Sequence, residues 1–326
     1  MLQDEIASAE SGLDYFVLDV FTDTRLQGNA LAVVPNPGSL SAETMQAIAR
    51  ETNLSETTFI ERRDFEIERR EGVRVRIFTT QEELPFAGHP TLGTASLLRS
   101  IAPECVSHGV VTLALNVGPV SVRFEPQAHA WPVQGTMTQR DPEFGEVLDA
   151  AQVAALTGLA IEDFDPARPI QIVSTGTAFA IVPLRSAESL AMLRVRHDDA
   201  TAFLQARGAR WFYVLGPEPS ANAEGPVTGP PAWRARMQFN GGEDPATGSA
   251  AGCAISYLVG HGAVASGQTI HVRQGIEIAR PSDLFLSARL IGGSQMPPPD
   301  PSESKVTDVR VGGSTILVAK GRLFLP

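Results

Sequence analysis

The sequence predicts an α+β protein built from two similar halves, and three observations lead to this prediction. Segments of alternating or β-branched residues recur along the chain and outnumber the helical patterns. A stretch that begins at Val73 matches a second stretch 160 residues later without a gap. The chain has 326 residues, which exceeds the usual size of a single hydrophobic core and favours two domains.

Strands are expected wherever residues alternate between apolar and polar or are rich in β-branched side chains. The clearest are Tyr15–Phe21, Leu31–Pro35, Thr57–Glu61, Val73–Thr79, Val110–Val117 and Val120–Phe124. Helices are expected at Ser41–Glu51, Pro90–Arg99, Val147–Leu156, Ala187–Leu193 and Ala246–Val259. Their irregular spacing does not support a regular βαβ alternation. Two segments rich in Gly and Pro, 217–231 and 292–304, are expected to be surface loops.

The internal match pairs residues 73–98 with residues 233–258, and seven of the 26 paired positions are identical. A repeat of this length indicates two similar halves, because the units of a solenoid recur every ~20–50 residues. A chance coincidence of two strand-then-helix patterns is the alternative. The identical pairs include Arg74 with Arg234, Arg76 with Arg236, Glu83 with Glu243, Pro85 with Pro245 and Gly88 with Gly248.

Composition excludes several classes of function. The formal charge is 26 minus 37, or -11, and such an acidic surface repels phosphate backbones, so no nucleic-acid partner is expected. The two cysteines form no disulfide framework, and the six histidines show no metal-binding spacing, so no metal is expected. The acidic N-terminus lacks the pattern of a signal peptide, which favours a cytoplasmic protein. The apolar segment 246–260 is shorter than the roughly 20 residues that cross a bilayer, so no membrane association is expected.

The first half of the repeat contains a turn, Phe86–Thr91, that leads into a helix. Pro90 suits the first turn of that helix, because its missing N–H costs nothing there. The free amides and the positive end of the helix dipole then form a site for a carboxylate or phosphate, with His89 at its mouth. A histidine that merely caps or packs at a helix end is the alternative.

The second half contains the corresponding turn, Gly241–Ala250, which places Gly248 and Ser249 at the positions of Gly88 and His89. No lysine follows the glycines, so the turn is not a P-loop and a nucleotide is not implied. A glycine-rich turn that only connects two elements is the alternative. We expect the two junctions to face a common cleft.

A third element, Asn53–Phe59, places Glu56 between a helical stretch and an apolar strand. Burial at such a position raises the pKa of a glutamate toward a pH at which it can both take and give a proton. An exposed glutamate at the end of a helix is the alternative.

With these residues, the sequence resembles the phenazine-biosynthesis PhzF-like family, whose fold is that of diaminopimelate epimerase. The resemblance spans nearly the whole chain. Its motifs are Gly28-Asn29 within residues 17–35, the block 53–59, residues 76–91 ending in GHPT, Ser174-Thr175-Gly176, GGEDPATGSA at 241–250 and Gly312-Gly313. The combination of LSET, GHPT and EDPATGSA in this order is highly specific.

The resemblance implies roles for seven residues. Glu56 would be the catalytic acid/base, and His89, Asp244 and Ser249 would position the substrate. The backbone amides of Gly88 and Gly248 would bind a substrate carboxylate, and Asn29 is a weaker candidate for the pocket. Such amides can stabilise the anion left by proton removal, so neither cofactor nor metal is needed.

The resemblance also implies the architecture. Each half would be a curved, mostly antiparallel sheet wrapped around a central helix, with domains at 14–130 and 131–314. Residues 315–326 would return to the first domain. The resemblance further implies a homodimer.

The expected function is isomerisation of a small unsaturated or cyclic carboxylic acid, with the natural substrate and product left open. An amino-acid epimerase or racemase is one alternative, in which Asp244 would serve as a second base. The epimerase relatives use two cysteines, but here Ala87 and Thr247 precede the two glycines. A non-catalytic protein that binds small acids is the other alternative.

Overall fold

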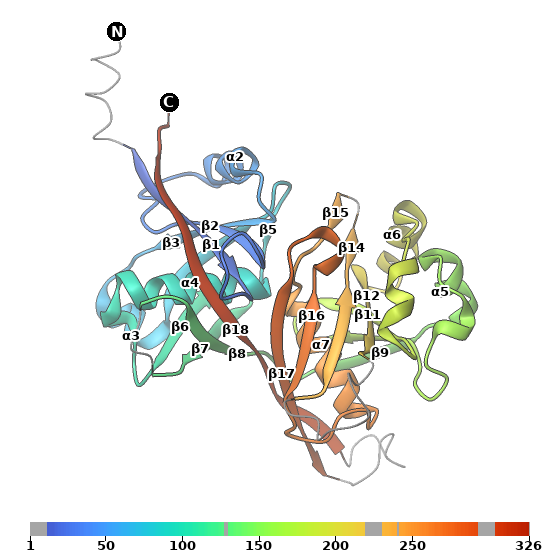
Figure 1. Ribbon diagram of the computed structural model, residues 1–326. Helices are drawn as coiled ribbons and strands as arrows, with labels where there is room; N and C mark the ends of the chain where they lie inside the picture. The colour runs from blue at the N-terminus through green and yellow to red at the C-terminus, as the bar shows by residue number, and fades with distance from the viewer. Residues whose placement is uncertain (1–11, 127–129, 219–229, 240, 293–303, 326) are drawn as a thin grey trace. The chain divides into compact units, whose positions relative to one another are not determined.

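The computed structural model describes residues 12–126, 130–218, 230–239, 241–292 and 304–325 (Figure 1). They form two compact units. Unit 1 contains the residues up to Met137 together with those from Ser314 onward, and unit 2 contains Thr138–Gly313. Most of the two expected surface loops, 217–231 and 292–304, lies outside the described residues.

Unit 1 is a mixed sheet that follows the order β18, β1, β2, β3, β4, β6, β7, β8. The pairs β2–β3 and β4–β6 are parallel, while β18–β1, β1–β2, β3–β4, β6–β7 and β7–β8 are antiparallel. Its elements are β1 (Leu13–Val20), β2 (Asn29–Val34), α2 (Ala42–Thr52), β3 (Glu56–Glu61), α3 (Phe65–Glu71), β4 (Val73–Phe78), β5 (Glu83–Leu84), α4 (Gly88–Ile101), η2 (Pro103–Cys105), β6 (Val110–Leu115), β7 (Gly118–Phe124), β8 (Val133–Thr138) and the end of β18 (Ser304–Leu323).

Helix α4 is the core of unit 1. All of its residues from Gly88 to Leu98 are buried, and it contacts β1, β2, β3, β6 and β7. Small residues allow this central position. A Cβ added at Gly93 would lie 2.6 Å from a methyl group of Leu31 and 2.8 Å from one of Val20. A larger residue there would push the helix away from β1 and β2.

Unit 2 repeats this plan around α7, which contacts β10, β11 and β17. The sheet follows the order β9, β10, β11, β12, β13, β16, β17, β18. Its elements are β9 (Glu143–Val147), α5 (Ala150–Thr157), η3 (Ile161–Asp163), β10 (Gln171–Ser174), β11 (Ala178–Pro183), η4 (Ala187–Met192), α6 (His197–Gln205), β12 (Trp211–Pro217), β13 (Ala232–Arg236), β14 (Gln238–Phe239), β15 (Gly242–Glu243), α7 (Gly248–Gly260), β16 (Ile270–Gln274), η5 (Ile276–Ile278), β17 (Ser282–Gly292) and the start of β18.

The strand pairings confirm that the two units are related. In unit 2, β10–β11 is antiparallel, β11–β12 parallel, β12–β13 antiparallel, β13–β16 parallel and β16–β17 antiparallel. The same alternation runs from β1 to β7 in unit 1. The central helices α4 and α7 occupy the same place in this order, between the two members of the second parallel pair. The predicted α+β fold, with a sheet around a central helix in each half, is therefore confirmed.

The last long strand, β18, belongs to both units. Its residues up to Gly312 pair with β17, from Gly292 back to Phe285. Its residues from Thr315 pair with β1, where Val20 faces Thr315 and Leu13 faces Leu323. The end of the chain thus adds a strand to unit 1.

Two helix predictions were wrong in detail. The segment Ala187–Met192 is a 3-10 helix and not an α-helix. Val147 ends strand β9, and the helix expected from Val147 begins only at Ala150. The reason lies in the cap, because the side chain of Asp149 accepts a hydrogen bond from the amide of Gln152 and fixes the first turn there.

Candidate active site

Glu56 is the first residue of β3, and its position depends on how α2 ends. Asn53 adopts the left-handed conformation (φ 50°, ψ 32°), and its amide bonds the carbonyl of Ala49, which terminates the helix. The hydroxyls of Thr52 and Thr57, 2.8 Å apart, then connect the helix end to the new strand. The side chain of Glu56 is only 15% exposed, so the prediction that this carboxylate is partly buried is consistent with the structure.

Three of the predicted site residues come together in unit 1. The imidazole Nε2 of His89 lies 3.2 Å from the carboxylate Oε2 of Glu56. Its Nδ1 lies 3.1 Å from the amide Nδ2 of Asn29, the fully buried first residue of β2. His89 is the second residue of α4 and is 4% exposed. The side chains of Asn29 on β2 and of Glu56 on β3 therefore both contact His89 at the start of α4.

The imidazole of His89 is neutral. Burial lowers its pKa to about 3, and a hydrogen bond with the backbone of Ala30 opposes this effect only in part. A neutral imidazole has one donor and one acceptor nitrogen. Because Nδ2 of the Asn29 amide can only donate, Nδ1 of His89 is the acceptor and Nε2 carries the hydrogen. The imidazole therefore presents its donor nitrogen on the side of the Glu56 carboxylate.

The predicted residues of unit 2 lie where β15 leads into α7. Gly248 is the buried first residue of α7, and Ser249, the second, is partly exposed. Asp244 is half-buried, and its Oδ2 accepts a hydrogen bond of 2.7 Å from the hydroxyl of Thr247. The structure thus groups Asp244, Gly248 and Ser249 within unit 2, and Asn29, Glu56, Gly88 and His89 within unit 1. The common cleft expected from the sequence stays a prediction.

Neither central helix is capped by a side chain at its start, unlike α2, α3 and α5. Those three helices use Ser41, Asp64 and Asp149 to accept from an amide of the first turn. The residue before α4 is Ala87, which has no acceptor, and Thr247, before α7, directs its hydroxyl to Asp244 instead. Uncapped amides at the positive end of a buried helix are suited to binding a carboxylate.

An arginine–glutamate pair braces the turn before each central helix. Arg76 donates to both oxygens of Glu83, at 2.9 and 2.7 Å, and Arg236 donates to both oxygens of Glu243, at 2.8 and 2.5 Å. These are identical positions of the internal repeat. The pair in unit 2 is more deeply buried, since both side chains are 6% exposed compared with 18% and 26% in unit 1.

Thiols do not occupy the predicted site. Cys253 lies buried in α7, where burial raises its pKa to about 11. Burial also raises the pKa of Cys105, which is in η2. Among the described residues, no group of three or more His, Cys, Asp and Glu side chains is placed to hold a metal ion.

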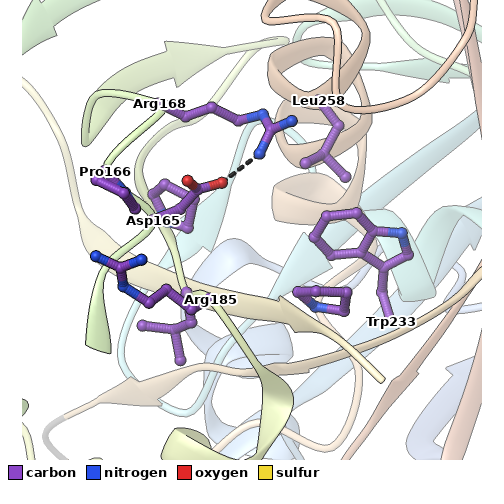
Figure 2. A pocket seen from close by; sticks show the side chains of 9 residues that line it. Asp165, Pro166, Arg168, Arg185, Trp233 and Leu258 are labelled. Carbon is purple, nitrogen blue, oxygen red and sulfur yellow. Dashed lines mark hydrogen bonds and ion pairs between the residues drawn. The ribbon is translucent and has the colours of Figure 1, made fainter. Parts of the chain in front are cut away.

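A cavity of about 300 Å³ lies elsewhere in unit 2 (Figure 2). It reaches Leu258, ten residues after Gly248 and thus roughly 15 Å along the axis of α7. Arg168 and Asp165 form an ion pair beside it, so the guanidinium is already matched by a carboxylate. None of the predicted site residues lines this cavity.

Sequence analysis missed the residues that support Asp244. The side chains of Gln274 and Tyr213 are fully buried and are linked by hydrogen bonds to the turn before α7. They lie 30 residues after and 31 residues before Asp244. Neither belongs to a recognisable motif, so nothing in the local sequence indicates their role.

A fold of two related halves, each with a sheet around a buried helix that starts at a glycine, is the fold of epimerase-like isomerases. A solved structure described as a predicted epimerase from Pseudomonas aeruginosa superposes with a TM-score of 0.75 at 32% identity, covering 96% of this chain and 100% of that one.

Among the helices in the described part of the chain, none meets both the length and the apolar character that a membrane span requires.

The family profile "Phenazine biosynthesis-like protein" matches residues 18–321. Trans-2,3-dihydro-3-hydroxyanthranilate isomerase from Pseudomonas aeruginosa is 35% identical over 315 residues, covering 95% of this chain and 99% of that enzyme. An uncharacterized isomerase from Mesorhizobium japonicum is 33% identical over 318 residues, covering 96% and 99%. The chain belongs to the phenazine biosynthesis-like family, and its enzyme class is that of an isomerase.

Proposed function

We propose that the protein is a cofactor-independent isomerase in which Glu56 moves a proton on a small unsaturated or cyclic carboxylic acid. The contact between Glu56 and the neutral His89 is the observation that carries this proposal. The relative that acts on trans-2,3-dihydro-3-hydroxyanthranilate supports the substrate class, because that compound is by name a partly unsaturated ring with a carboxylate.

The proposed reaction moves one proton and no net electrons. Glu56 removes a proton from a carbon of the substrate, and the electron pair of the broken C–H bond shifts along the adjacent double bond. The protonated Glu56 then delivers the proton to the carbon at the far end of the shifted system. Product and substrate are isomers, and the carboxylate of Glu56 is regenerated.

The remaining predicted residues would bind the substrate and its anion. Amides at the starts of α4 and α7 would bind the substrate carboxylate, where charge develops during proton transfer. Asp244 and Ser249 would contact the polar substituents of the same substrate. Asn29 would hold the imidazole of His89 in place.

A deuterium experiment tests this proposal. Wild type and Glu56→Gln are incubated in D₂O with trans-2,3-dihydro-3-hydroxyanthranilate and a panel of small unsaturated acids, and deuterium in the carbon skeleton is followed by NMR. We expect incorporation by wild type to fall about 1,000-fold in Glu56→Gln, while affinity for a substrate analogue largely survives. Glu51→Gln, an exposed change at the end of α2, is the matched control. Equal incorporation by wild type and Glu56→Gln would refute the mechanism.

An epimerase is the second candidate, favoured by the solved relative that is described as a predicted epimerase. Inversion at one carbon needs a base on each face, and Asp244, with a carboxylate oriented by Thr247, would be the second. With amino-acid substrates, deuterium would then enter only at Cα, together with loss of optical purity. Deuterium at a different carbon with no loss of optical purity favours isomerisation.

A further inference from the structure

The turn that carries Asp244 is held by a buried glutamine. Gln274 is the last residue of β16 and is fully buried. Its side-chain amide makes four hydrogen bonds, and three of them go to the turn before α7. Its Nε2 donates to the carbonyl of Asp244 at 2.8 Å and to the hydroxyl of Thr247 at 2.9 Å. Its Oε1 accepts from the amide of Thr247 and from the hydroxyl of Tyr213, both at 3.1 Å.

We propose that Gln274 is a positioning residue for the reaction. Its side chain sets the direction of the Thr247 hydroxyl, and thereby orients the Asp244 carboxylate and the start of α7. The inference rests on the proposed function, because it assigns a role to a residue that supports the substrate-binding turn.

The hydrogen bonds around Gln274 have only one consistent direction. The carbonyl of Asp244 can only accept and the amide of Thr247 can only donate, so the orientation of the Gln274 amide is fixed. Because the Thr247 hydroxyl receives an N–H from Gln274, its own hydrogen is directed to Oδ2 of Asp244, 2.7 Å away. The hydrogen bonds from Tyr213 through Gln274 and Thr247 to Asp244 form a chain, here called the relay. Tyr213 begins it as a donor, since burial and the charge of Asp244 raise the pKa of its hydroxyl. The chain of hydrogen bonds therefore ends on the carboxylate of Asp244.

The backbone is arranged to allow this contact. Gly275, directly after Gln274, has a φ of 76°, and a Cβ there would lie 2.7 Å from the carbonyl oxygen of Pro245. A side chain at this position would push β16 away from the turn. The strand and the turn are thus packed backbone against backbone, at the point where Gln274 reaches across.

The fold alone does not require these polar groups, as unit 1 demonstrates. In corresponding strands, Val73 pairs with Leu113 and Trp233 pairs with Val272. Two residues further along lie Leu115 and Gln274, both buried. In the repeat, Asp244 and Thr247 correspond to Leu84 and Ala87. Apolar residues thus build the same junction in unit 1, and the polar set in unit 2 serves a different purpose.

Gln274→Leu, which installs the residue of unit 1, tests the proposal. We expect kcat to fall about 100-fold, because a small misplacement of a binding group costs about this much, while KM changes less than threefold. Thr247→Val should lose a similar factor, and the double variant should lose no more than either single change. Thr247→Ser keeps the hydroxyl and should restore most of the activity. Gln205→Leu, at the exposed end of α6, is the matched control.

A second measurement does not depend on turnover. Amide hydrogen exchange, followed by mass spectrometry on peptides that cover residues 242–252, should be at least tenfold faster in Gln274→Leu and Thr247→Val. Peptides from β10–β12 should be unchanged. If Gln274→Leu does not fold, Thr247→Val with Thr247→Ser carries the test alone.

The outcomes separate the two proposals. If wild type incorporates no deuterium into any substrate in a way that depends on Glu56, the proposed function fails. The amide-exchange measurement on residues 242–252 still tests whether Gln274 holds the turn. If wild type is active and a folded Gln274→Leu keeps its kcat, or the exchange at 242–252 is unchanged, the positioning role is refuted.

Discussion

The N-termini of the two central helices, α4 and α7, share a backbone arrangement, but the polar side chains around them come from different places. In unit 1, Asn29 and Glu56 come from two strands, and each of them contacts His89 on the helix itself. In unit 2, Asp244 is oriented by Thr247 and Gln274. Strand pairing places Trp211 where unit 1 has Glu56, and the repeat places Ser249 where unit 1 has His89. The comparison teaches that one duplicated backbone plan can gather polar side chains from separate elements in one copy and hold a polar turn from behind in the other.

The largest expected effect tests whether both units serve one substrate. Glu56→Gln should lower kcat about 1,000-fold and Asp244→Asn about 100-fold. If the two residues act in the same step, the double variant should lose about 1,000-fold rather than their product. The measurement is single-turnover deuterium incorporation. Multiplicative losses would mean that the two side chains act independently.

The two arginine–glutamate ion pairs, Arg76–Glu83 and Arg236–Glu243, should contribute differently to stability because they are buried to different extents. Arg236→Met leaves the buried Glu243 without its partner and should lower the free energy of unfolding by about 3–5 kcal/mol. Arg76→Met removes a more exposed partner and should cost about 1 kcal/mol. Urea denaturation of each variant measures the difference. The double variant Arg236→Met/Glu243→Leu should recover most of the loss, and equal costs in the two units would contradict the argument from burial.

A smaller effect depends on pH and belongs to unit 1. The pKa of His89 is about 3 in the folded protein and near 6.5 when unfolded, so below pH 6.5 the unfolded chain binds a proton that the folded chain does not. The free energy of unfolding is therefore unaffected by the titration of His89 above pH 6.5, and it decreases steadily as the pH falls from 6.5 toward 3. Between pH 7 and pH 5 the free energy of unfolding should drop by about 2 kcal/mol on this account.

The control for this pH effect is a matched pair of variants. His89→Asn should lack that part of the drop, whereas His108→Asn, at an exposed position, should retain it. Denaturant titrations at pH 7 and pH 5 supply the comparison. An unchanged drop in His89→Asn would mean that another group is responsible.

The smallest effect compares two buried hydroxyls at equivalent strand positions, Tyr213 in β12 and Thr58 in β3. Tyr213 donates to Gln274, and Thr58 bonds the hydroxyl of Thr94 at 2.8 Å. Tyr213→Phe and Thr58→Val should each cost about 1 kcal/mol of stability. Only Tyr213→Phe should also speed amide exchange in the turn before α7, because only Tyr213 belongs to that relay.

The predictable part of the fold came from features that act locally or repeat. The internal match located both central helices and paired Arg76–Glu83 with Arg236–Glu243, whose equivalent ion pairs the structure contains. Alternation located six strands of unit 1 to within two residues, namely β1, β2, β3, β4, β6 and β7, whereas β5 and β8 were missed. Helices α3 and α6 were missed, because Phe65–Glu71 is short and charged and His197–Gln205 buries only Ala200 and Leu204.

The candidate site was predictable only where motifs mark it. The contact of Asn29, Glu56 and His89 joins residues 33 to 60 positions apart, and only the family resemblance linked them beforehand. Gln274 and Tyr213 lie 61 residues apart and meet because β12, β13 and β16 are neighbours in the sheet. Such a relay depends on strand order, which composition and local periodicity do not encode.

The shared strand β18 has a consequence for how the protein is made in the cell. Leu13 of β1 pairs with Leu323, 310 residues later, whereas the pairings of unit 2 all form within residues 138–313. At a translation rate of roughly 5–20 residues per second, β1 waits about 15 to 60 s for this neighbour. Most strands of unit 2 are synthesised during that interval, whereas the sheet of unit 1 cannot be completed until the chain has reached Leu323.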